Sequence, residues 1–162
     1  MRLVAEKAGW GRKMPAGRGL GLAFNHAHNT YAAEIAEVSV DANNKLTVHK
    51  ITVVIDCGLV VNPAGAEYQV QGSVLDGYSA MLRQHLDIEN GRIQQTNFDS
   101  YRLLEMKDAP EVEVHFVPSD LPPTGLGEPA LPPVAPAIGN AIFAATGRRV
   151  RSLPLIKEGF TV

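Results

Sequence analysis

A solitary glutamate in a proline-rich stretch is the strongest candidate for chemistry in this sequence. Glu128 is the only charged residue of segment 121–147, which also holds six of the eleven prolines. Gly127 before it permits close approach of backbone or ligand, and Pro129 after it stiffens the chain. Apolar surroundings disfavour an ionised carboxylate, which makes it a better proton acceptor near neutral pH. The pattern is that of a general base.

A structural role for Glu128 is equally compatible with the spacing. The carboxylate could form an ion pair with a nearby arginine, or lie near a helix N-terminus, where the helix dipole favours negative charge. The candidate arginines are Arg148, Arg149 and Arg151. The spacing alone leaves catalysis and structure equally open.

Other residue types that often carry chemistry lack the partners that such chemistry requires. His26 and His28 would project from one face of a strand, as in some metal sites, but no third ligand accompanies them, so we expect no metal. Cys57 has no neighbouring histidine, and a buried structural thiol is the simpler interpretation. Segment 17–21, Gly-Arg-Gly-Leu-Gly, lacks the context of a phosphate-binding loop, so we interpret it as strand or turn.

The composition is that of one ordinary domain. The 162 residues are 45% hydrophobic, and 15 Lys and Arg against 17 Asp and Glu give a net charge of −2. This balance argues against nucleic-acid binding, and no apolar stretch approaches the roughly 20 residues that span a bilayer. One cysteine excludes an iron–sulfur cluster held by this chain alone. The compartment, cytoplasmic or periplasmic, stays open.

The elements that must position these residues are predicted to be strands and helices without strict alternation. We therefore expect an α+β fold, an antiparallel or mixed sheet packed with two main helices. Gly72 and Gly77 inside the first helix predict a close neighbour, either a helix or a ligand. The expected elements are a hairpin of runs 32–40 and 46–55, a helix from Asn62-Pro63, a hairpin over 86–95 turning at Asn90-Gly91, a strand over 111–117, a helix over 133–145 that stops at Gly147, and a short β-run to Leu153.

The first residues are expected to lie ahead of the sheet. Residues 3–8 are typical of the end of a helix without a capping residue, and a Pro/Gly-rich link follows over 14–21. Such a short helix is marginal alone. We expect 1–20 to be the tail of a truncated helix plus a linker, within a single domain, 1–162, that is a fragment of a longer protein.

Ordered motifs along nearly the whole chain resemble one enzyme family. Together they resemble the C-terminal molybdopterin-binding region of the xanthine dehydrogenase/aldehyde oxidase family of molybdenum hydroxylases, in particular the large subunits of isoquinoline 1-oxidoreductase-like enzymes. The motifs are Ala8-Gly9-Trp10-Gly11, Gly17-Arg18-Gly19, the corner from Asp56-Cys57-Gly58 to Asn62-Pro63, Gln69-Val70-Gln71-Gly72, Asn97-Phe98-Asp99-Ser100-Tyr101, Pro110-Glu111-Val112, and Gly125-Leu126-Gly127-Glu128-Pro129 through Ala144-Ala145-Thr146-Gly147-Arg148-Arg149.

The resemblance implies a reaction and a site. Glu128 matches the glutamate of the family's Gly-x-Gly-Glu motif, which implies that it is the catalytic base for hydroxylation of an N-heteroaromatic ring or an aldehyde with oxygen derived from water. Gly127, Gln69 and Gly72 would hold part of a molybdopterin, in the cytosine dinucleotide form. The implied partners are the remaining domains of the large subunit and an iron–sulfur small subunit that takes the electrons.

The chain departs from the family pattern at three positions, and its length opens a second interpretation. Ser73 replaces a frequent glycine and Asp76 a frequent glutamine, which puts the cofactor contacts of the helix in doubt. Glu105 replaces a frequent arginine, a change that would alter a salt bridge or a subunit contact. Because much of the family's active site lies outside this chain, we expect the isolated chain to be inactive and free of cofactor. The alternatives are a non-catalytic folding or assembly module, or an α+β domain that binds a small metabolite.

Overall fold

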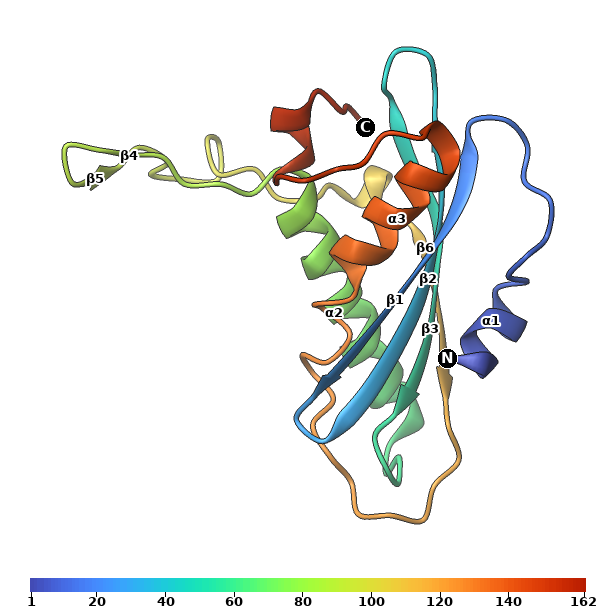
Figure 1. Ribbon diagram of the computed structural model, residues 1–162. Helices are drawn as coiled ribbons and strands as arrows, with labels where there is room; N and C mark the ends of the chain where they lie inside the picture. Colours follow the sequence, from blue (N-terminus) through green and yellow to red (C-terminus); the bar gives the residue numbers. More distant parts are fainter.

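The architecture is a four-stranded mixed sheet with two long helices on one face and a short helix on the other (Figure 1). The structure, a computed structural model, describes residues 1–162. The expected α+β fold is confirmed. In chain order the elements are α1 (Arg2–Lys7), β1 (Arg18–Ala27), β2 (Thr30–Val40), β3 (Leu46–Asp56), α2 (Pro63–Leu82), β4 (Ile88–Glu89), β5 (Arg92–Ile93), a 3-10 turn (Met106–Asp108), β6 (Glu111–Phe116), α3 (Val134–Thr146) and a second 3-10 turn (Leu155–Glu158).

The main sheet has the strand order β1-β2-β3-β6. Strands β1, β2 and β3 form an antiparallel meander, and β6 returns beside β3 in parallel. The predicted hairpin of β2 and β3 is confirmed, with a register irregularity at Glu37 and Val38. The parallel pairing of β6 brings the long loop that follows it to the same end of the sheet as the β1–β2 turn (Figure 1).

Helices α2 and α3 cover one face of the sheet and enclose the main core. Helix α3 packs closely on β1 because glycines alternate along that strand. A Cβ at Gly21 would overlap backbone atoms of Ala137 and Ala141, and one at Gly19 would lie 2.7 Å from the amide nitrogen of Ala145. The glycine-rich segment 17–21 therefore serves helix packing, in agreement with its interpretation as strand or turn rather than phosphate cradle.

Local signals set most element ends as predicted. Asn62 caps α2 by accepting a hydrogen bond from the Gly65 amide at 3.1 Å, and Pro63 occupies the first helical position. Gly147 ends α3 with a φ of +75°. The projecting hairpin of β4 and β5 turns at Asn90 and Gly91, which both have positive φ.

Two expectations about the ends of the chain are wrong. Strand β1 begins at Arg18, inside the segment assigned to the linker. No strand forms over 148–153. There the Arg148 guanidinium donates to the Glu158 carbonyl oxygen, and Phe160 is buried in the main core. Contacts distant in sequence therefore fold the tail back where local β-propensity predicted an extended strand.

Helix α1 lies against the opposite face of the sheet. Its Val4 is fully buried and packs in a small cluster with Ala33, Ile35 and Val54. None of the helices has the length and hydrophobicity needed to cross a lipid bilayer.

Candidate active site

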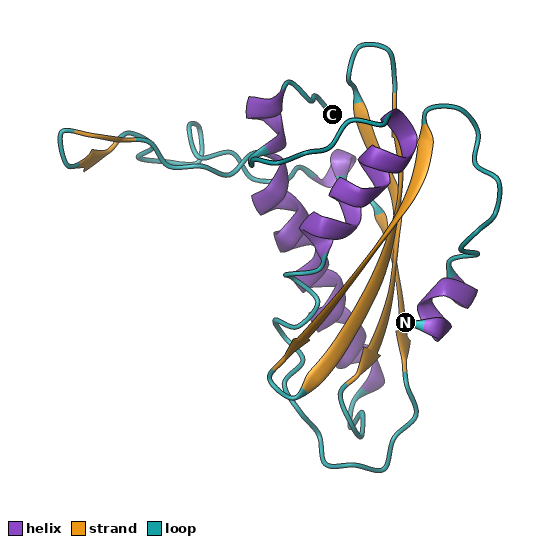
Figure 2. Ribbon diagram, in the orientation of Figure 1, coloured by secondary structure: helices purple, strands orange, loops and turns teal.

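The loop that carries Glu128 joins β6 to α3 and contains neither helix nor strand (Figure 2). Backbone hydrogen bonds attach it to the end of the sheet. The Thr124 amide donates to the Cys57 carbonyl at 2.9 Å, and the Leu59 amide donates to the Leu121 carbonyl at 2.9 Å. Further along, the Asn25 side-chain amide donates to the Pro129 carbonyl at 3.0 Å. The loop is thus fixed at both sides of Glu128.

A buried threonine ties this loop to the β1–β2 turn. Thr30 is completely buried, and its hydroxyl lies 2.6 Å from the hydroxyl of Thr124 and also donates to the Gly125 carbonyl. The Gly125 amide donates in turn to the His28 carbonyl at 3.1 Å. A Cβ at Gly125 would lie 2.5 Å from the Cβ of His28, so only glycine permits this approach.

Glu128 itself lies at the surface, with 78% of its side chain exposed. Its Oε2 atom is 3.0 Å from Nε2 of His28. None of the candidate arginines pairs with it: Arg148 contacts Glu158, Arg149 donates to Asn140, and Arg151 forms no ion pair. The expectation of an apolar enclosure is wrong for this chain, since the apolar residues of the loop leave the carboxylate open to solvent.

The glycine before this glutamate lies against helix α2. A Cβ at Gly127 would be 3.2 Å from Oε1 of Gln69. Gln69 is exposed, and its amide makes no hydrogen bond within the chain. The backbone N–H groups of Leu126, Gly127 and Glu128 likewise find no acceptor in the chain. Gln69 and Gly127, which are predicted to bind the cofactor, therefore lie where an unpaired side-chain amide meets a run of free backbone donors.

Gly72 lies one helical turn beyond Gln69 on α2 and is exposed. The close neighbour predicted for it is absent from this chain, since a Cβ there would meet nothing within 4 Å. The same prediction is confirmed at Gly77, where a Cβ would lie 2.8 Å from the Leu131 carbonyl oxygen. One glycine of the helix packs under the loop, and the other faces open space beside Gln69.

The three departures from the family pattern have different surroundings. Ser73 is buried, and its hydroxyl has no partner in the chain. Asp76 is exposed on α2. Glu105 forms an ion pair with Lys107 at 2.9 Å, which lowers the pKa of the glutamate carboxyl, and lies 3.7 Å from Arg83. Glu105 therefore belongs to a surface ion-pair cluster rather than to the site around Glu128.

The two histidines do not share a face, because β1 ends at Ala27 and His28 belongs to the turn that follows it. His26 stacks on Tyr31 with 4.4 Å between ring centroids. No group of three or more His, Cys, Asp or Glu side chains is arranged to hold a metal ion. The role of His28 as the neighbour of Glu128 was missed by sequence reasoning, although His28-Asn29 between two strands is a recognisable turn signal.

Cys57 is buried, as predicted, with 4% of its surface exposed. Burial, with a smaller contribution from the nearby Asp56 carboxylate, raises the pKa of its thiol. A thiol that holds its proton is a poor nucleophile. Cys57 is therefore part of the packing beneath the loop.

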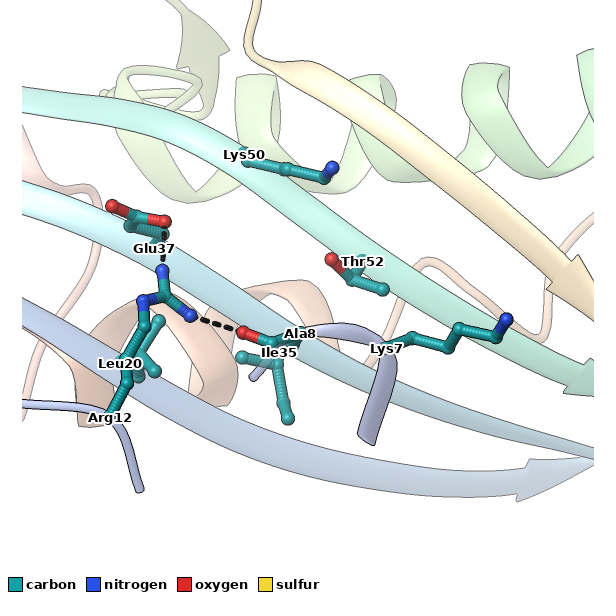
Figure 3. A pocket seen from close by; sticks show the side chains of 8 residues that line it. All are labelled: Lys7, Ala8, Arg12, Leu20, Ile35, Glu37, Lys50 and Thr52. Carbon is teal, nitrogen blue, oxygen red and sulfur yellow. Dashed lines mark hydrogen bonds and ion pairs between the residues drawn. The ribbon is translucent and has the colours of Figure 1, made fainter. Parts of the chain in front are cut away.

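A cavity of about 240 Å³ lies on the other side of the sheet, beside α1 (Figure 3). Its charged side chains neutralise one another: Arg12 pairs with Glu37, and Lys50 pairs with Glu113 at 2.7 Å and with Glu111 at 3.1 Å. Apart from Lys7, its cations are engaged in these pairs. The cavity is therefore lined by ion pairs within the sheet and between the sheet and the segment after α1, and it holds none of the candidate residues.

Comparison with known proteins identifies the family. A sequence model described as molybdopterin cofactor-binding domain matches residues 3–110. The chain belongs to this family. The chain is 38% identical over 161 residues to a membrane-bound aldehyde dehydrogenase [pyrroloquinoline-quinone] from Gluconacetobacter polyoxogenes, covering 96% of this chain and 21% of the relative. It is 33% identical to isoquinoline 1-oxidoreductase subunit beta from Brevundimonas diminuta, covering 96% and 20% respectively.

Solved structures agree with this assignment. The aldehyde oxidoreductase from Desulfovibrio gigas aligns with a TM-score of 0.67 and 27% sequence identity over 77% of this chain and 14% of that chain. The chain spans about one fifth of the length of the two relatives from Gluconacetobacter polyoxogenes and Brevundimonas diminuta.

Proposed function

We propose that this chain contributes the general base and part of the molybdopterin site to a molybdenum hydroxylase. The observation that carries the proposal is the juxtaposition of Glu128 with Gly127 and Gln69 on one exposed surface. Membership of the molybdopterin cofactor-binding domain family supports it. Its place as the C-terminal part of a larger subunit is included in the proposal.

The residues present fit a pterin with a phosphate-bearing tail. Free N–H groups of Leu126, Gly127 and Glu128 are suitable donors to pterin or phosphate oxygens, and the missing side chain of Gly127 leaves them accessible. The Gln69 amide donates and accepts at once, which suits the mixed edge of a pterin. Open space at Gly72 leaves room for the same group. We propose the cytosine dinucleotide form.

Glu128 would accept a proton from the oxygen nucleophile that attacks the substrate carbon. A bound molybdenum centre would supply the redox change and would make the attacking oxygen easier to deprotonate. The chain's own task is to hold a carboxylate at a defined place with one oxygen unoccupied, and the fixed loop and the His28 contact do so. Positioned proton transfer of this kind contributes a rate factor of about 10² to 10⁴.

We propose an N-heteroaromatic or aldehyde substrate, supported by relatives named as isoquinoline 1-oxidoreductase, nicotinate dehydrogenase and aldehyde dehydrogenase. The chain holds one cysteine, so electrons would leave through clusters on an iron–sulfur small subunit. The subunit names of several relatives support such an assembly.

The isolated chain is proposed to fold but to turn nothing over. Glu128 and Gln69 are both open to solvent, so this chain supplies one wall of a site that needs further walls to exclude water and hold the cofactor. Metal and pterin analysis of the purified chain tests this. Stoichiometric molybdenum together with dye-linked oxidation of a heterocycle or an aldehyde would contradict it and favour a self-sufficient enzyme over an assembly module.

Replacement of Glu128 by glutamine tests the base directly in the full-length subunit. We expect turnover to fall by about 10² to 10⁴ while molybdenum and pterin contents stay near normal, because only the proton acceptor is removed. Glu89→Gln is the matched control, since Glu89 is an exposed glutamate on the projecting hairpin. If Glu128→Gln retained activity within a few-fold of wild type, the assigned base would be wrong.

A further inference from the structure

The imidazole of His28 faces the carboxylate of Glu128 from a different part of the chain. Nε2 of His28 lies 3.0 Å from Oε2 of Glu128, with 57% and 78% of the two side chains exposed. A pair this open contributes little to folding stability. We infer that His28 is a positioning residue that orients Glu128 for proton transfer. This inference rests on the proposed role of Glu128 as the base.

The backbone of the β1–β2 turn carries the first argument. Ala27 pairs with Thr30, so the turn consists of His28 and Asn29, with φ of +53° and +59°. Such a two-residue turn favours glycine, asparagine or aspartate, and a histidine in this left-handed region is unfavourable relative to glycine. Backbone conformation of this kind clusters at functional sites. The turn geometry therefore tolerates a histidine without selecting it over glycine or asparagine, whereas the Glu128 contact uses the imidazole.

The attachment of the turn to the loop that carries Glu128 provides the second argument. The Gly125 amide donates to the His28 carbonyl at 3.1 Å, and the absence of a side chain at Gly125 lets the Cβ of His28 approach. Buried Thr30 joins the same loop through Thr124. The Cα of His28 is thus held against the segment that precedes Glu128, and the ring needs only its own side-chain torsions to reach the carboxylate.

The contact leaves the carboxylate able to act as a base. Nε2 of His28 lies 3.0 Å from Oε2, a distance from which an N–H can donate, while Oε1 has no partner in the chain and stays free to receive a proton. An exposed glutamate otherwise samples many rotamers, and restricting them raises the fraction of productive geometries. His28 therefore acts through Glu128 and does not itself contact the reacting atoms.

The kinetic test compares two glycine substitutions in the same turn of the full-length subunit. Glycine is favoured at both positions, so neither His28→Gly nor Asn29→Gly is expected to lower the melting temperature. We expect His28→Gly to lower kcat about tenfold with KM within twofold of wild type, because misorientation of the base affects the chemical step. Asn29→Gly should leave both constants within twofold. His28→Gln, which places an amide donor near the position of Nε2, should recover most of kcat.

A spectroscopic test uses the chain without cofactor. In the ¹⁵N-labelled chain, the ring nitrogens of His28 should report the Nε2–H tautomer, and Glu128→Ala should change their chemical shifts while those of His26 stay the same. The inference is overturned if the His28 ring shifts are the same in both proteins, or if His28→Gly is fully active in a subunit that Glu128→Gln inactivates. If Glu128→Gln itself is active, the proposed base is wrong, a result that differs from both of these.

Discussion

The loop around Glu128 and the centre of the sheet each hold one glutamate, and the two regions surround it in opposite ways. Glu128 is exposed and contacts His28. Glu34, on β2, is fully buried, and neither of its oxygens has a hydrogen-bond partner. Alternation along the strand places it between Ala32 and Ala36, on the face that α2 and α3 cover.

The two glutamates show that burial in this chain does not coincide with the proposed catalytic surface. Burial holds the pKa of the Glu34 carboxyl well above its usual value. A strongly shifted pKa often marks a functional residue, so by this criterion alone Glu34 would be the candidate. Yet Glu34 faces only the apolar core, whereas Glu128 lies beside free backbone donors and the Gln69 amide. The sheet and its helices therefore provide most of the folding stability, and the proposed chemistry takes place on an exposed surface next to them.

The largest effect should distinguish the two glutamates by activity. In the full-length subunit, Glu128→Gln should lower turnover by about 10² or more, and Glu34→Gln should leave it within twofold. In chemical denaturation of the chain alone, Glu128→Gln should change the free energy of unfolding by less than about 0.5 kcal/mol, as is usual at exposed positions. An inactive Glu34→Gln subunit with normal cofactor content would contradict this assignment, because it would show that the buried glutamate is needed for activity.

Glycines of the two regions should differ nearly as strongly, this time in stability. Gly21→Ala forces a methyl group into the backbone of α3, where Ala137 and Ala141 cannot move independently, and should cost about 3 kcal/mol. Gly127→Ala meets only the mobile end of Gln69 and should be nearly neutral. Urea unfolding of both variants measures the difference. Equal destabilisation would show that the loop is part of the cooperative core.

Much of the fold follows from local sequence signals, and the site does not. Asn62-Pro63 and Asn90-Gly91 determine backbone geometry within a few residues, and the structure has them as expected. The contact of His28 with Glu128 joins two loops that are distant in sequence, and tertiary packing through Thr30 creates it. The burial of Glu34 likewise depends on which sheet face the helices cover.

The family resemblance, rather than residue spacing, selected Glu128 for catalysis. Spacing left catalysis and an arginine pair equally open, and the structure shows no arginine partner. The same spacing predicted an apolar enclosure that the chain does not provide. The sequence predicts a feature well when neighbouring residues determine its geometry. It predicts the surroundings of a side chain poorly when those surroundings come from segments distant in sequence.

Glu34 should also produce a pH-dependent stability that the loop lacks. Its pKa is raised in the folded state, so the folded chain keeps a proton that the unfolded chain releases above pH 4.5 or so. Stability should therefore fall as pH rises from about 5, by up to about 1.4 kcal/mol per pH unit, until the folded-state pKa is reached. Because Glu34→Gln lacks the titrating carboxyl, the wild-type-minus-variant difference in unfolding free energy should carry this slope between pH 5 and 8. If this difference did not change with pH, the Glu34 carboxyl would have to be hydrated or hydrogen-bonded in the folded chain.

The smallest effect compares two glycines of α2, one that faces open space and one that packs under the loop. Gly72→Ala should stabilise the isolated chain by roughly 0.5 to 1 kcal/mol, because alanine is the better helix former and a Cβ there meets nothing within 4 Å. Gly77→Ala should destabilise it, since the methyl group would lie 2.8 Å from the Leu131 carbonyl oxygen. In the full-length subunit Gly72→Ala should instead lower pterin content, because the open space belongs to the proposed cofactor surface. Thermal unfolding of the chain and pterin content of the subunit measure the two effects, and a stabilised chain with normal pterin content would remove Gly72 from the site.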